Sequence, residues 1–196
     1  MLHLSRWPVL GAVLTAAALF TGSSAAQSVN VSGQASAVTA VFMGTITSLA
    51  DTGTLTDPSD PRGAGQSLGS IPGLLGAEVL HAVTMAWTDQ VVSVASLANL
   101  ALTVAGVDIT ADFLMSRAYA VSGAGSTGRA NIDGLRIAGV ALTPLGTPNE
   151  EISLPGLSVI VNEQVQSAGG IVVNALRVRA LDGTTDVVIG TAKAGI

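Results

Sequence analysis

The sequence EEISLPGLSVIVNEQVQSAGGIVVNALRVRALDGTTDVVIGTAKAGI, residues 150–196, indicates the fold class of this chain. Short runs rich in Val, Ile and Thr alternate with Gly, Pro and Asp-Gly, which are residue types of tight turns. This pattern is typical of antiparallel strands joined by hairpins. No catalytic motif occurs within it, so the stretch predicts architecture and not an activity.

The last hairpin of the chain can be given a register from its turn residues. If residues 182–183, Asp-Gly, form a two-residue turn, Arg179 lies opposite Asp186 and the apolar positions of both strands coincide. Arg179 and Asp186 would then form an opposite-charge pair on the solvated face, contributing about 0.2–1 kcal/mol. A four-residue loop, residues 182–185, keeps the same faces but places Arg179 opposite Val188.

The preceding sequence also predicts strands, separated by loops. Residues 29–48 read as one or two strands, residues 50–69 as a turn-rich loop, and residues 70–76 as a Pro/Gly connector. Residues 78–88 alternate with a period of two and predict a strand, although residues 74–87 also fit helical spacing.

Three further segments complete the β pattern. Residues 91–104 predict a bulged strand whose apolar parity changes after Val94. Residues 109–121 alternate as one half-buried strand, with Tyr119 on the same face as Ile109. Residues 126–141 predict a hairpin that turns at Asp133-Gly134. We therefore expect an all-β protein, an antiparallel β-sandwich or a related two-layer arrangement.

The first 26 residues have the plan of a secretory signal peptide, expected to form a helix. Arg6 precedes an uncharged apolar run, residues 7–20, and small residues follow up to Ala26. We expect cleavage between Ala26 and Gln27, leaving residues 27–196 as a single β-rich domain. A retained membrane anchor is the alternative, but the apolar run is shorter than the roughly 20 residues that span a bilayer.

Composition narrows the range of partners and cofactors. The net charge is −5 and the chain has one lysine, which argues against nucleic acid and anionic lipid as partners. It has no cysteine, so an exported form must be stable without disulfides. After cleavage Trp87 and Tyr119 would be its single Trp and Tyr, the residue types that most often anchor ligands and interfaces.

Several segments resemble one family of exported bacterial proteins. The matching segments are residues 93–112, 125–140, 151–164 and 173–196, with VNEQ at 161–164 and VNAL at 173–176 as the most specific pieces. In this order they resemble the choice-of-anchor P family, over about residues 78–196. The resemblance implies a secreted or envelope-associated β-domain with no defined enzymatic activity, whose members carry varied C-terminal surface anchors.

The C-terminal residues of this sequence differ from those of anchored members. They contain no sortase tail, no hydrophobic helix and no basic cluster, and Leu154-Pro155-Gly156 is more simply a turn. We therefore expect free secretion or non-covalent retention at the cell surface.

Glu163 is a candidate site residue because it lies on the apolar face of its predicted strand, where an unpaired charge is costly. It could act in a hydrolase pair with Glu150 or Glu151. Alternatively, a bulge turns it outward, or Arg117 or Arg136 pairs with it.

Other polar residues are weaker candidates. Asn174 interrupts the apolar face of the next strand, and we expect it to bond the backbone at a strand entry or bulge. His81, among apolar neighbours, is expected to be a partly buried structural histidine and not a metal ligand. Asp51, Asp57 and Asp60 could hold calcium, but their spacing matches no EF-hand and Asp-Pro is ordinary turn chemistry.

No motif indicates catalysis or a cofactor. Residues 123–128, GAGSTG, resemble a dinucleotide loop in composition alone, and no βαβ unit surrounds them. We expect no enzyme activity, no cofactor and no metal, and a secreted structural or surface-interaction protein. Its edges or flat faces would contact envelope components or other copies of the chain.

Two other functions stay open from the sequence. The first is a carbohydrate- or ligand-binding module with a cleft near Trp87 and Tyr119. The second is a hydrolase built on carboxylates such as Glu163 and Asp112, which would have to converge.

Overall fold

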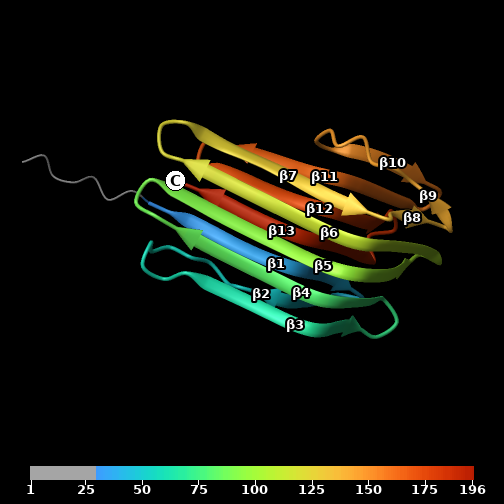
Figure 1. Ribbon diagram of the computed structural model, residues 1–196. Coiled ribbons are helices and arrows are strands. Elements are labelled where there is room, and N and C mark those ends of the chain that lie inside the picture. The colour runs from blue at the N-terminus through green and yellow to red at the C-terminus, as the bar shows by residue number, and fades with distance from the viewer. Residues whose placement is uncertain (1–29) are drawn as a thin grey trace, which may run out of the picture.

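The computed structural model describes residues 30–196, which form two antiparallel β-sheets packed face to face (Figure 1). The expected β-sandwich is thereby confirmed. The strands of the two layers run in nearly the same direction, as in aligned sheet packing. No helix occurs among the described residues, and so none that could cross a membrane. The predicted signal peptide, residues 1–26, and its cleavage point at Ala26–Gln27 lie outside them.

The first sheet has six strands in the spatial order β10-β11-β12-β13-β1-β2. Their bounds are β10 Glu150–Leu154, β11 Leu157–Ser167, β12 Gly170–Ala180, β13 Thr185–Gly195, β1 Ser32–Phe42 and β2 Thr45–Asp51. Strand β1 pairs with β13, so the first and last described strands are neighbours. In the β12–β13 hairpin Arg179 lies opposite Asp186, which confirms the register predicted for a turn at residues 182–183.

The second sheet has seven strands, of which β3, β4, β5, β6, β8 and β9 follow one another and β7 pairs with β6. Their bounds are β3 Arg62–Ile71, β4 Leu75–Ala86, β5 Gln90–Val104, β6 Val107–Val121, β7 Gly125–Asp133, β8 Arg136–Ile137 and β9 Val140–Ala141. The period-two reading of residues 78–88 as a strand is confirmed by β4.

Two sequence-based predictions about connections were wrong. Residues 126–141 do not form a hairpin at Asp133-Gly134, because β7 and β8 both pair with β6, one after the other along the same edge. The tight turn comes later, at residues 138–139 between β8 and β9. Residues 50–69 are not wholly a loop, since β2 continues to Asp51 and β3 begins at Arg62.

In the six-stranded sheet, one row of residues crosses β11, β12, β13, β1 and β2, and the side of each of these strands that points inward changes at this row. Asn162 in β11, Gly190 in β13 and Ala50 in β2 have φ angles of 51°, 62° and 49°, in the left-handed region. The register places Asn162 and Gly190 on either side of Ala175 in β12. Such residues interrupt the pleat, as bulges do. The buried apolar positions of β12 are accordingly Ile171, Val173 and Ala175 up to the row, and Leu176, Val178 and Ala180 beyond it.

The seven-stranded sheet contains a matching row. Val79 in β4 and Asn99 in β5 both have φ of 49°. Asn99 lies opposite Asp112 of β6, because the neighbouring pairs are Ala98 with Phe113 and Leu100 with Ala111. Strand β6 buries Ile109 and Ala111 on one side of this row, and Leu114, Ser116, Ala118 and Ala120 on the other.

This reversal corrects two predictions about strand faces. The parity of β5 changes at Asn99 and not after Val94, since Val91, Ala95 and Leu97 are all buried. Residues 109–121 do not alternate uniformly, so Tyr119 lies on the opposite face from Ile109.

The rows divide the core between the sheets into two ends of different composition. One end is filled mainly by Leu, Val and Ile side chains from both sheets. The other end is filled largely by alanines, including Ala35, Ala82 and Ala95. At this end the sheets approach closely, because a side chain on Gly33 would overlap Thr84 and one on Gly128 would overlap Val173. Small residues are therefore required where β7 crosses β12.

Replacing Gly128 with alanine tests this close approach. We expect Gly128→Ala to lower the free energy of unfolding by about 1–3 kcal/mol, because the new methyl group would meet the Val173 side chain and the Arg117 carbonyl. Denaturant unfolding measures the change. The matched control is Gly76→Ala in β4, where a methyl group would meet nothing within 4 Å and the change should stay within about 0.5 kcal/mol. Equal losses in the two variants would contradict the packing.

Candidate functional site

Trp87 and Tyr119 lie at the same end of the seven-stranded sheet, linked through Gln90. The Trp87 N–H donates to the Gln90 carbonyl at 2.7 Å and closes the turn between β4 and β5. The Tyr119 hydroxyl donates to the Gln90 side-chain oxygen. The ring of Tyr119 is thereby held in place, whereas the Trp87 side chain is 44% exposed.

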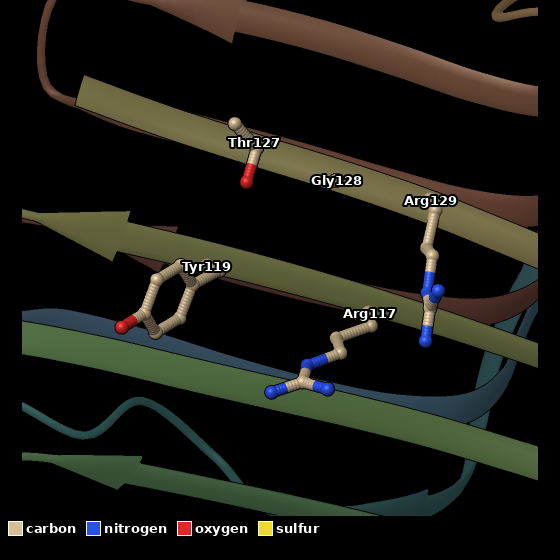
Figure 2. Close-up of a pocket in the computed structure, with 5 residues that line it drawn as sticks. All are labelled: Arg117, Tyr119, Thr127, Gly128 and Arg129. Carbon is tan, nitrogen blue, oxygen red and sulfur yellow. The ribbon is translucent and has the colours of Figure 1, made fainter. Parts of the chain in front are cut away.

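A pocket of about 290 Å³ lies on the outer face of β6 and β7, lined by Arg117, Tyr119, Thr127, Gly128 and Arg129. Arg117 is directly opposite Arg129, and Tyr119 is directly opposite Thr127. Figure 2 shows both arginine side chains and the Tyr119 ring on the same side of these two strands. The pocket is thus formed by a short paired segment of β6 and β7 that carries two cationic side chains and one aromatic ring.

The two arginines of this pocket lack acidic partners. The ion pairs within residues 30–196 are Arg62–Asp60, Arg177–Glu163 and Arg177–Asp186, so neither Arg117 nor Arg129 takes part in one. In β5, the strand on the other side of β6, the residues opposite Arg117 and Tyr119 are the apolar Val94 and Val92. Like charges placed directly opposite each other destabilise a sheet. An anion between these guanidinium groups would remove that cost.

The face reversal in β6 creates this arrangement. Ile109 and Ala111 point into the core, so unbroken alternation would send Arg117 and Tyr119 into the core as well. Because the inward face changes between Asp112 and Leu114, both side chains reach the outer face instead. Tyr119 was predicted from the sequence as an interaction residue, but Arg129 and its pairing with Arg117 were not, since these depend on the β6–β7 register.

Glu163 lies on the outer face of the six-stranded sheet. Its neighbours Asn162 and Gln164 point toward β7, where Asn162 accepts from the Ala130 N–H at 3.0 Å and Gln164 donates to the Gly128 carbonyl at 3.1 Å. Glu163 therefore points outward. This agrees with the first of the two structural alternatives, in which a bulge turns the side chain away from the core. The other alternative, a pairing with Arg117 or Arg136, was wrong, because the arginine that pairs with Glu163 is Arg177.

A polar network surrounds the buried Glu163 carboxylate. Asn174 donates to it at 2.6 Å, and Arg177 pairs with it at 3.1 Å. Arg177 also forms two bonds with Asp186, at 2.7 and 3.0 Å, and its pKa is raised by this contact, so the guanidinium stays charged. The predicted pair of Arg179 with Asp186 is not formed, because Arg177 reaches Asp186 diagonally.

Asn174 bridges side chains and does not bond the backbone, contrary to the sequence-based expectation. Its amide N–H donates to Glu163, and its oxygen accepts from the Thr191 hydroxyl at 2.9 Å. Each polar group of the Asn174 amide thus has a side-chain partner. This arrangement is typical of a buried structural network.

The carboxylates proposed for hydrolysis do not converge. Asp112 is exposed in β6, in the other sheet from Glu163, and lies beside Gly134. Glu150 accepts from the Leu145 N–H at 2.8 Å, and Glu151 from the Ser158 hydroxyl at 3.2 Å. The Glu163 carboxylate is bonded to Asn174 and Arg177. The four carboxylates therefore form no acid–base pair across a pocket.

His81 and the acidic loop do not form a metal site. His81 is exposed on β4, opposite Gly65 and Ser96, and not partly buried as expected. Within residues 30–196 no group of three or more His, Cys, Asp or Glu side chains could hold an ion.

The aspartates of this loop have local roles. Asp57 accepts from the Ser59 N–H and hydroxyl, which lowers the pKa of its carboxyl group. Asp60 pairs with Arg62, and Asp51 accepts from the Gly53 N–H. Residues 123–128 join β6 to β7 and continue into β7, with no helix following.

No family model, curated protein or solved structure matches this chain. The resemblance to the choice-of-anchor P family therefore stays a prediction.

The Arg177 network provides a stability test with a matched control on the same strand. We expect Arg177→Met to destabilise the fold by about 2–3 kcal/mol, because it leaves the Glu163 carboxylate poorly solvated and without a cation. Arg179→Met removes an exposed arginine that forms no ion pair within the described part of the chain, and should change stability by less than about 0.5 kcal/mol. Adding Glu163→Gln to Arg177→Met should recover part of the loss. Similar unfolding midpoints for the two single variants would contradict this account.

Proposed function

We propose that this chain is a secreted, non-enzymatic surface-interaction protein of the bacterial envelope or extracellular space. Its interaction surface is the outer face of the seven-stranded sheet. One observation carries this assignment: Arg117 and Arg129 lie directly opposite each other, without acidic partners among the described residues, beside the fixed ring of Tyr119.

The surroundings of the pocket support binding. Next to Tyr119 and Arg117, the outer face continues over Val92 and Val94 to Met85, which is 37% exposed. A half-exposed apolar surface bordered by arginine and tyrosine has the composition of binding interfaces. Because Arg117 and Arg129 stand on paired strands and Gln90 holds the Tyr119 ring, their backbone positions and this ring are fixed before a partner arrives.

The acidic residues support a binding role over a catalytic one. Glu163 forms an ion pair with Arg177, and Asp112 belongs to the opposite sheet. General acid–base hydrolysis of glycosides needs two carboxyl groups roughly 5–10 Å apart on either side of a substrate. The pocket on β6 and β7 is lined by cations instead.

Retention on envelope preparations tests the proposal. We expect the purified protein to cosediment with bacterial cell-wall material, and the double variant Arg117→Ser, Arg129→Ser to bind about tenfold more weakly, because charged hydrogen bonds are lost. Arg179→Ser, which removes one exposed positive charge from the other sheet, is the control and should bind like wild type. Light scattering of the same samples measures self-association, which the unpaired edge of β3 permits. Wild-type protein that stays in solution, or a double variant that binds like wild type, would contradict the proposal.

A further inference from the structure

We propose that the pocket formed by Arg117, Tyr119, Thr127 and Arg129 binds the carboxylate-bearing sugar residues of an acidic glycan. This inference deepens the proposed function and rests on it. Each part of a uronic acid residue, its carboxylate, its apolar ring face and its hydroxyl groups, has a matching group on these two strands.

The paired arginines match the carboxylate. A guanidinium group presents its N–H donors in a planar fork that fits two carboxylate oxygens. Arg117 and Arg129 occupy directly opposite positions of the β6–β7 ladder, so a single carboxylate between them can receive donors from both. Neither arginine makes a side-chain hydrogen bond or ion pair elsewhere within residues 30–196, so these donors are available.

Tyr119 and Thr127 match the sugar ring. The Tyr119 hydroxyl is engaged by Gln90, which fixes the aromatic ring beside the arginines (Figure 2). An aromatic face held in this way packs well against the C–H groups of a pyranose. Thr127, on the facing strand, is exposed and offers a hydroxyl to the sugar oxygens.

The shape and charge of the molecule favour a glycan over other anions. A volume of about 290 Å³ is at the small end of ligand pockets and suits one ring of a longer chain lying across the strands. The net charge of −5 repels densely charged polyanions such as nucleic acid. A glycan that carries one carboxylate per sugar has a lower charge density, and the two arginines can recognise it locally.

Isothermal titration with defined oligosaccharides tests the ligand class. The probe is an oligogalacturonate of about eight units, and its control is the same oligosaccharide with every carboxylate methyl-esterified. We expect binding of the acid form that weakens as salt rises, and at least tenfold weaker binding of the ester, because the ester cannot accept charge-assisted hydrogen bonds. Inorganic sulfate and vesicles of phosphatidylglycerol are titrated as two further probes, which test for a free anion and for a lipid headgroup as the ligand. Equal binding of acid and ester, or tighter binding of either further probe, would overturn the proposal.

Matched variants assign the binding to these residues. Arg117→Gln and Arg129→Gln should each weaken oligogalacturonate binding about tenfold without lowering the melting temperature, because each relieves a like-charge pair. Tyr119→Leu should weaken binding, whereas Tyr119→Phe, which keeps the ring, should retain most of it. Arg179→Gln should bind like wild type. Arginine variants with unchanged affinity would overturn the proposal.

The two proposals fail in different ways. If cell-wall retention depends on Arg117 and Arg129 but oligogalacturonate does not bind, the ligand class is wrong and the interaction surface stands. If cell-wall retention does not depend on these arginines, the assignment of this face as the interaction surface is wrong.

Discussion

The structure depends on one constraint, the reversal of strand faces along a row of residues in each sheet. Asn162, Gly190 and Ala50 adopt left-handed conformations in one sheet, and Val79 and Asn99 do so in the other. A two-layer sandwich can accept such a reversal only if neighbouring strands reverse at the same level, since otherwise polar side chains would enter the core. The register shows that they do so across β11, β12 and β13 and across β5 and β6.

The reversal determines where the polar chemistry of the molecule lies. It turns Glu163 to the outer face of the six-stranded sheet, where Asn174 and Arg177 satisfy its carboxylate. It likewise turns Arg117 and Tyr119 to the outer face of the seven-stranded sheet, where no carboxylate among residues 30–196 pairs with the arginine. In the first cluster the Arg177 guanidinium pairs with both carboxylates, those of Glu163 and Asp186, and the cluster supports the fold. The other keeps an excess of positive charge and is therefore the better candidate for binding.

The sequence predicted the fold well because its signals were local. Gly183 follows Asp182 between two apolar runs, and this pair determined both the turn and the pairing of Arg179 with Asp186 across the strands. A parity change was predicted in β5, but after Val94 instead of at Asn99, and none was predicted in β6. Period-two reasoning assumes an unbroken pleat, and a single residue with positive φ breaks it. Asn99, Asn162 and Gly190 are of the types that tolerate this conformation, but Asn and Gly are also common in turns. The pairing of Arg117 with Arg129 was not predictable, because residues 126–141 suggested a hairpin of their own.

The absence of cysteine from the chain allows the reversal in β6 to be measured directly by thiol labelling of single-cysteine variants. On one side of Asp112, a cysteine in place of Thr110 should react and one in place of Ile109 should be protected. On the other side, cysteines in place of Arg117 and Met115 should react, and one in place of Ala118 should be protected. The account predicts that reactive positions change from even to odd numbers across Asp112. Reactivity that keeps the same parity from Ile109 to Val121 would contradict it.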